Sequence, residues 1–310
     1  CANIDRSGEA SRAMKWQLYG YDRETNPRLS QVRDLVVFRN MLTQSNTTHK
    51  SVPLILSSVN TDEHEELYRR KGLPALFNEA GFDTWFISNQ SRQGAMIDNL
   101  AHDARHLIYI RSPRYDMQLL DEVRKVLENS DSQKILIVLH CYGSHFSYHQ
   151  RYPREFAHFR PEGDVAIAKQ HRQTLVNAYD NSIRYTDHFL AETIAYLRTL
   201  EDTSTALPVL WGPPLGGSPA PSRRNFPEKV AAAEANETAP ATTHALFHTM
   251  ADMASLEGRF ISKETSLVNS GYDRTAPRRY LNDHNEAVPF RKTGLGPEDM
   301  EVFRRYGIEP

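Results

Sequence analysis

The chain has 310 residues, with 37 basic and 39 acidic side chains and a formal net charge of −2. This balance argues against nucleic acid as the main partner, because binding to a polyanion depends on an excess of Lys and Arg. The chain is long enough to bury a large core, and no apolar run approaches the roughly 20 residues of a membrane span.

Cysteine usage and the first residue bear on processing and redox chemistry. Only Cys1 and Cys141 occur, so neither a disulfide framework nor a cysteine metal site is expected. The chain begins with Cys1 instead of methionine, which favours a fragment or a processed form. Cys1 is then a truncation point or, alternatively, a lipid-modified terminus, and Cys141 is expected to be a small buried side chain.

Strand and helix patterns alternate along the chain. Runs rich in β-branched, aromatic and aliphatic residues predict strands at 34–38, 84–87, 107–110 and 134–140. Apolar residues at three- and four-residue spacing predict helices at 65–80, 117–129, 166–199 and 243–254. The first of these helices should end at Gly81, and the continuous apolar strand at 134–140 should be buried on both faces. This alternation indicates an α/β fold with helices around a largely parallel sheet.

One segment departs from this alternation. Residues 208–224 contain five prolines and three glycines. Proline lacks the backbone N–H that a helix or a central strand requires, and glycine weakens both elements. An irregular or mobile loop is therefore predicted here.

Polar side chains crowd the end of the strand at 134–140. Three histidines, His140, His145 and His149, surround a turn at Gly143 and Ser144. Functional groups in open α/β sheets gather at the carboxyl ends of strands. A lone histidine is more often structural, but this grouping favours a functional site. His145 is the preferred candidate, because the glycine turn should leave it exposed.

Two further residues carry little information when each is taken alone. Thr48 precedes an apolar run and has the position of a helix cap. Glu9 is an acidic residue next to a glycine, which by itself needs no function. Their interpretation depends on the segments around them.

Several short segments, taken in order, carry a family resemblance. They are residues 8–12, 19–23, 25–27, 48–53, 138–140, 143–145, 151–153, 179–183 and 185–187. In this order they resemble the phosphoethanolamine transferases of the alkaline-phosphatase/sulfatase superfamily, which include lipid A-modifying enzymes that confer polymyxin resistance. The similarity runs from about residue 7 to about residue 206 and resumes near Phe226. It implies one catalytic domain over residues 1–310, with an α/β/α sandwich and a largely parallel central sheet.

The resemblance also implies site residues and a reaction. Thr48 would be the nucleophile, and Glu9 and Thr48 would be ligands of a catalytic Zn²⁺. His145 and Asn89 would bind the substrate, with a second metal as the other possible partner of His145. Zinc coordination would favour the alkoxide of the threonine hydroxyl, which is a poor nucleophile at neutral pH.

The implied reaction transfers phosphoethanolamine from phosphatidylethanolamine to lipid A or core lipopolysaccharide through a phosphothreonine-type intermediate. The implied location is the periplasmic face of the bacterial inner membrane. Membrane association would come from a segment absent from this chain, and no nucleic-acid partner is expected.

One family motif has no counterpart in this sequence. Relatives carry Ser-Asp-His-Gly-Glu, whose Asp and His bind zinc, after a strand resembling residues 203–207. Here the Pro/Gly-rich segment 208–224 follows directly, and the family pattern returns at 226–230. Asp283-His284 has the same residue types as the missing motif but does not follow a predicted strand. Asp187-His188 falls within a predicted helix. Neither pair is therefore taken as the missing zinc ligands. Because zinc sites need three or four protein ligands, weak zinc binding and low transferase activity are predicted.

Two other functions remain open. The first is a catalytically inactive module that binds lipid or lipopolysaccharide head groups. The second is a phosphodiesterase or sulfatase-like hydrolase of the same superfamily. No Cys-x-Pro-x-Arg sequence is present, which disfavours the formylglycine chemistry of sulfatases.

Overall fold

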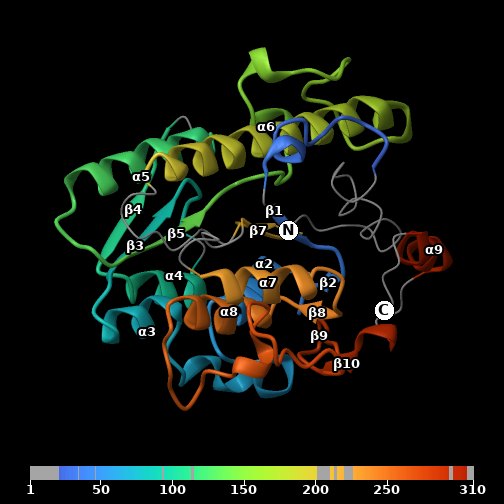
Figure 1. Cartoon of the computed structure of the whole chain (residues 1–310). Coiled ribbons are helices and arrows are strands. Elements are labelled where there is room, and N and C mark those ends of the chain that lie inside the picture. The colour runs from blue at the N-terminus through green and yellow to red at the C-terminus, as the bar shows by residue number, and fades with distance from the viewer. Residues whose placement is uncertain are drawn as a thin grey trace.

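The computed structural model describes residues 21–33, 35–45, 47–92, 94–112, 115–200, 210–212, 215–219, 226–292 and 296–305. Strands lie between two layers of helices (Figure 1). One layer contains α5 (Met117–Asn129) and α6 (Arg172–Arg198). The other contains α2 (Thr48–Ile55), α3 (Leu73–Glu79), α4 (Ala95–His102), α7 (Pro227–Ala235) and α8 (Ala245–Met253). None of the helices described has both the length and the hydrophobicity of a membrane span.

Parallel strands form the part of the sheet beside α5. Their order is β4 (His106–Tyr109), β3 (Asp83–Ser88) and β5 (Ile135–His140), and both pairings are parallel. Ser88 is opposite His140 in the register, so β3 and β5 end at the same edge. A second parallel pair joins β2 (Met41–Leu42) to β8 (Ala241–Thr242). These strands confirm the predicted α/β class and the strands expected at 84–87, 107–110 and 134–140.

Antiparallel strands complete the architecture. β7 (Leu215–Pro219) pairs with both β1 (Leu35–Phe38) and β6 (Leu210–Gly212). A separate two-stranded ribbon joins β9 (Arg279–Leu281) to β10 (Ala287–Pro289). The last described helix is α9 (Pro297–Arg305).

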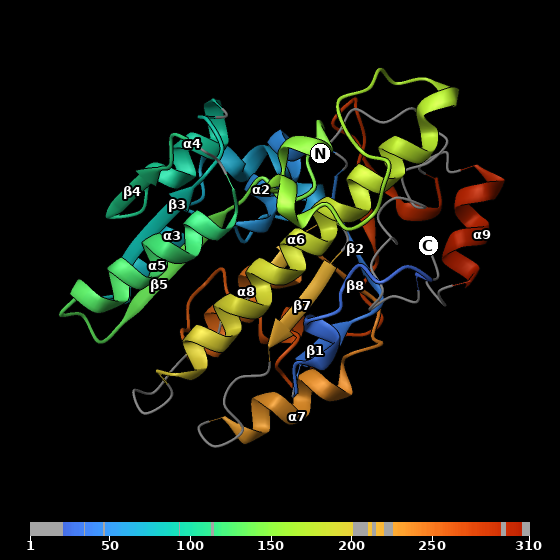
Figure 2. The ribbon, with the colours of Figure 1, turned by 90° about the horizontal axis from the view of Figure 1, so that it is seen from above.

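Strand β3 lies at the centre of the hydrophobic core. Its consecutive residues Phe86 and Ile87 are buried on opposite faces, since side chains alternate along a strand. Phe86 packs with Val52 of α2 and with residues of α3, α4 and α8. Ile87 packs with residues of α5 and α6, which lie on the same side of the strands (Figure 2). Burial on both faces therefore fixes β3 between the helical layers.

The helix predicted at 65–80 is two elements instead of one. A 3₁₀ helix covers Thr61–Tyr68, and α3 begins only at Leu73. The break occurs because the N–H of Leu73 donates to the carbonyl of Leu56 at 2.6 Å. A Cβ at Gly72 would lie 2.5 Å from Leu100 Cδ2, so a larger residue there would require the Leu100 side chain to shift. The predicted end at Gly81 is confirmed by its φ of +81°.

The expectation of an irregular loop at 208–224 was wrong for its described residues. Strands β6 and β7 pair with each other, and Val37 of β1 is opposite Gly217. The segment tolerates a strand because Leu215–Pro219 places its proline at the last position. The four preceding residues retain the N–H groups that pairing requires.

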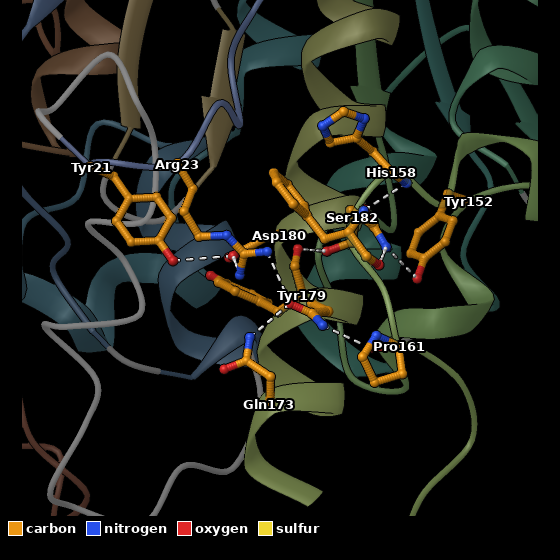
Figure 3. Close-up of polar contacts among 12 residues, drawn as sticks. Tyr21, Arg23, Tyr152, His158, Pro161, Gln173, Tyr179, Asp180 and Ser182 are labelled. Atoms are coloured by element: carbon orange, nitrogen blue, oxygen red, sulfur yellow. Dashed lines mark hydrogen bonds and ion pairs between the residues drawn. The ribbon is translucent and has the colours of Figure 1, made fainter.

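Helix α6 binds a segment near the N-terminal end of the chain through a buried carboxylate. Asp180 has an exposed fraction of 0% and forms a 2.5 Å ion pair with Arg23. The hydroxyl of Tyr21 donates to the same carboxylate at 3.1 Å. Figure 3 shows Tyr21 and Arg23 reaching Asp180 from one side of the helix. This cluster joins residues about 160 positions apart in the chain.

On its other side α6 binds the segment 158–161 (Figure 3). Asn181 Oδ1 accepts the N–H groups of His158 at 3.0 Å and Phe159 at 2.8 Å. Asn177 Nδ2 donates to the carbonyl of Pro161 at 2.8 Å. The guanidinium of Arg23 lies 3.9 Å from the centre of the Phe159 ring, so the two segments also contact each other.

Replacing Asp180 with alanine should therefore destabilise the protein strongly. The change leaves the Arg23 charge without its buried partner, which typically costs about 3–5 kcal/mol. Urea unfolding measures this loss. The control is Glu192→Gln, which removes the exposed pair with Arg28 and should change stability by less than about 1 kcal/mol. Equal losses in both variants would contradict the assignment.

Candidate functional site

The turn that carries His145 begins where β5 ends. Gly143 has a φ of +51°, in the region that favours glycine. His145 is half buried, and its Nδ1 lies 2.7 Å from the carbonyl oxygen of Phe146. Nδ1 must therefore donate, which leaves Nε2 as the acceptor of the neutral ring. Burial lowers the pKa of His145, so the neutral form is favoured at pH 7.

A buried carboxylate forms hydrogen bonds with the backbone of this turn. Asp116, whose exposed fraction is 1%, accepts a hydrogen bond from the N–H of Gly143 at 3.1 Å. Asn89 Nδ2 donates to the same carboxylate at 2.8 Å. Asn89 Oδ1 accepts the N–H of Tyr142 at 2.8 Å. Asp116 and Asn89 thus bind two consecutive backbone N–H groups just before His145.

Asn89 is completely buried at the end of β3. Both ends of its side-chain amide bind Asp116 and the backbone of Tyr142. Of the two proposed substrate-binding residues, Asn89 therefore binds the backbone three positions before the other, His145. A direct contact between Asn89 and substrate stays a prediction.

The histidine at the end of β5 has a different environment. His140 Nδ1 lies 3.0 Å from the Ser88 hydroxyl, which joins the ends of β3 and β5. Burial lowers the pKa of His140 to about 4. His140 is consequently a neutral residue of the strand ends, which is the structural role that a lone histidine usually has.

Thr48 is the first residue of α2 and is half buried. It shares a helix face with Val52, one turn later. Val52 packs against Phe86 and Leu136 of the parallel sheet, so Thr48 begins the sheet-facing side of α2. A helix N-terminus stabilises negative charge. This position suits a hydroxyl that becomes an alkoxide or carries a phosphate.

Two hydroxyls beside Thr48 have no hydrogen bond within the described part of the chain. They belong to Thr47, the N-cap residue of α2, and to Ser51, one turn further. Thr47 makes no side-chain cap. A buried polar atom without a partner is unfavourable. Such atoms beside a proposed nucleophile are consistent with a site built for a polar ligand.

The proposed metal ligand Glu9 lies outside the described residues. Within the described residues, no group of three His, Cys, Asp or Glu side chains could hold a metal ion. Asp283 and His284 are exposed on the turn between β9 and β10, where the carbonyl of Asp283 accepts from Lys50 Nζ at 3.3 Å. The described residues alone therefore do not form a zinc site.

Asp116 was not identified from the sequence as a residue of this site. Its only signal is its position directly before the helix at 117–129, where Asp is a common cap. Its side chain caps nothing in α5 and instead binds Gly143. That role depends on the neighbouring strand end, which no local pattern reveals.

The sequence model of the sulfatase family matches residues 7–208. The chain belongs to the sulfatase family. This sulfatase-family chain is 31% identical over 204 residues to Kdo(2)-lipid A phosphoethanolamine 7''-transferase of Escherichia coli (strain K12), covering 62% of the chain and 35% of that protein. It is 30% identical over 207 residues to phosphoethanolamine transferase EptA of the same strain, covering 64% and 38%. The chain therefore spans little more than a third of the length of these curated relatives.

Solved structures resemble this sulfatase-family fold over most of its length. The C-terminal periplasmic domain of EcEptC from Escherichia coli aligns with a TM-score of 0.75 and 22% identity, covering 91% of this chain and 90% of that domain. The soluble domain of lipooligosaccharide phosphoethanolamine transferase A from Neisseria meningitidis aligns with a TM-score of 0.70 and 21% identity, covering 84% and 90%. These likenesses confirm the predicted fold.

Asp116 should make stability depend on pH. Burial raises its pKa from the ordinary value of 3.8 to about 6, so the folded state binds this proton more tightly than the unfolded state does. The resulting stabilisation is full below the unfolded pKa and is lost as pH rises through 6. From pH 4 to pH 7, the wild type should lose up to about 3 kcal/mol relative to Asp116→Asn.

Urea unfolding of both proteins at the two pH values measures this difference, and other titrating groups cancel because both proteins contain them. Asp121→Asn, on the exposed side of α5, is the matched control and should follow the wild type. Parallel curves for wild type and Asp116→Asn would contradict the expectation.

Proposed function

We propose that residues 1–310 form one catalytic domain that transfers phosphoethanolamine from phosphatidylethanolamine to lipid A or core lipopolysaccharide. The observation that carries the proposal is the position of Thr48 at the sheet-facing N-terminus of α2. The names of the relatives support this reaction class. The alignment over 90% of the C-terminal periplasmic domain of EcEptC supports a single domain.

In the proposed reaction, Thr48 Oγ1 forms a bond to the phosphorus of phosphatidylethanolamine. The bond from phosphorus to the diacylglycerol oxygen breaks, and diacylglycerol leaves with the proton released by the threonine hydroxyl. An oxygen of the acceptor then forms a bond to this phosphorus, the bond from phosphorus to Thr48 Oγ1 breaks, and the threonine oxygen takes up the proton released by the acceptor or a proton from water. His145 Nε2 can accept a proton or, once protonated, donate to a phosphate oxygen.

Zinc is the cofactor that the resemblance implies, and one structure of the EcEptC periplasmic domain is described as a complex with Zn. A bound divalent cation would favour the alkoxide of a hydroxyl ligand. Thr48 and Glu9 are the proposed ligands. The family match ends at residue 208, which supports the proposal that the segment 208–224 replaces the Asp-His motif block. We therefore expect the metal site to be incomplete and the transferase activity to be low.

We further propose that the domain works at the periplasmic face of the bacterial inner membrane. The EcEptC neighbour is described as a periplasmic domain, which supports this location. Membrane association would come from a segment outside these 310 residues. The membrane would then present both the phospholipid donor and the lipid A acceptor to Thr48.

Thr48→Ala should abolish the covalent intermediate, because no other residue would carry the transferred group. The protein is incubated with isotope-labelled phosphatidylethanolamine in detergent, and peptide mass spectrometry locates the label. The matched control is Thr47→Ala, which deletes the adjacent hydroxyl and should keep the label on Thr48. A label on Thr47 would contradict the proposal.

The same experiment separates the two rival functions. Head-group binding without any labelled threonine would support an inactive binding module. Release of free phosphoethanolamine without an acceptor would support a hydrolase.

Zinc binding should be weak in the purified chain, since loss of the Asp-His motif leaves fewer than three of the expected ligands. Isothermal titration calorimetry with Zn²⁺ at pH 7 measures the affinity. Glu9→Gln should weaken any residual binding further. Tight one-to-one binding by the wild type would show that other residues complete the site.

A further inference from the structure

A polar cavity lies against α6, between two segments that the helix holds in place. Its volume is about 420 Å³. Residues that line it include Arg28, Glu155, Phe156, His158, Arg184 and His188. This volume falls within the range of small-molecule sites. The cavity is therefore large enough for a small ligand.

The cavity faces away from the turn that carries His145. Arg184 and His188 are four residues apart and share one face of α6. Thr186 lies between them, about 200° around the helix from each. Thr186 Oγ1 is 4.0 Å from the position that a Cβ on Gly143 would occupy. The cavity and the candidate active site thus use opposite faces of α6.

Hydrogen-bond donors in the cavity exceed the partners around them. Arg184 uses only Nη1, which donates to the carbonyl of Glu24 at 2.7 Å and to its carboxylate at 2.9 Å. Arg28 likewise uses only Nη1 of its guanidinium, which donates to Glu192 at 2.5 Å. The remaining guanidinium nitrogens of both have no hydrogen-bond partner within the described part of the chain. The glutamates therefore orient the two arginines and leave donors available.

Two histidines of the cavity lining, His188 and His158, offer further hydrogen-bonding groups. His188 Nδ1 is buried without a hydrogen bond to any described residue and lies 3.9 Å from Glu192 Oε1. The His158 backbone N–H is bound by Asn181, which fixes that residue at the cavity wall. The neutral imidazole of each histidine carries one N–H that can donate to an anion.

Carboxylates also stand near these donors: Asp187 and Glu155 line the cavity, and Glu24 and Glu192 pair with the two arginines. Asp187 already accepts the N–H groups of Arg28 and Leu29, each at 2.9 Å. Glu155 is exposed to solvent. The open positions are consequently donors, and an anion with several oxygens matches two arginines better than a single carboxylate does.

We propose that this cavity binds a phosphate group, from a small organic phosphate or from a lipid head group. The two arginines would donate to its oxygens, and the imidazoles would contribute further hydrogen bonds. Thr48 does not line this cavity. The phosphate-binding proposal is therefore independent of the transfer reaction proposed above.

Calorimetry with inorganic phosphate and with glycerol 3-phosphate at pH 6.5 tests the proposal. Arg184→Gln should weaken binding at least about tenfold, as expected for the loss of a charge-assisted hydrogen bond. Arg184→Lys keeps the charge and should also weaken binding, because an ammonium cannot form the bidentate hydrogen bonds of a guanidinium. His188→Gln should have a smaller effect.

Two controls separate this site from other causes. Arg198→Gln removes one exposed positive charge from the same helix and should change binding by less than about twofold. Thr48→Ala, which alters the candidate active site, should leave the Arg184-dependent part of the phosphate binding unchanged. Circular dichroism and the unfolding midpoint show whether each variant is folded. Equal phosphate affinity in folded Arg184→Gln, or no binding by the wild type, would overturn the proposal.

Flotation with phosphatidylcholine vesicles, with and without phosphatidic acid, identifies the source of the phosphate. Arg184-dependent binding to the phosphatidic acid vesicles supports a lipid head group. Binding of glycerol 3-phosphate without vesicle binding supports a small soluble phosphate. Vesicle binding that is unchanged in Arg184→Gln and occurs without binding of either soluble phosphate would count against the cavity.

Discussion

A row of buried polar side chains on α6 sets the position of much of the surrounding structure. Asn177, Asp180, Asn181 and Asp187 are almost completely buried, and burial of such groups is unfavourable unless hydrogen bonds compensate it. The compensating groups come from two distant segments, 21–29 and 158–161. Helix α6 is therefore stabilised in this position by both segments, and the cavity lies between them.

The same helix also borders the candidate site. Tyr179 packs edge-to-face on Tyr148, with ring centres 4.8 Å apart, just beyond the His145 turn. From the other side, Asp116 and Asn89 bind the backbone of Tyr142 and Gly143. The turn is thus held between α6, α5 and the end of β3. His145 gains a defined orientation from these contacts, although none of them involves its own ring nitrogens.

The nucleophile position is built differently. Thr48 depends on α2, which is anchored by Val52 against the core around Phe86. His145 depends on the edge where β3 and β5 end. In this sulfatase-family fold, the two predicted residues are placed by separate elements that meet at the same buried strand, β3. A mutation in the core near Phe86 would therefore affect both elements.

Local pattern and family resemblance predicted a substantial part of this molecule. The helix at 117–129 and the strands around 84–87 and 134–140 were predictable because apolar spacing reflects burial of a single element. Thr48 and Glu9 were chosen from short segments that resemble a known family, and His145 from such a segment and from its glycine turn at the strand end. Glu9 lies outside the described residues, so its position beside Thr48 stays a prediction.

Tertiary structure decided the features that depend on residues far apart in the chain. The break at Gly72 follows from contacts with Leu56 and Leu100, and β7 exists because β1 and β6 pair with it. The role of Asp116 requires the turn after β5. Sequence periodicity reports how one element meets water or core, whereas these features depend on which distant backbone groups need a partner, and only the folded chain supplies that partner.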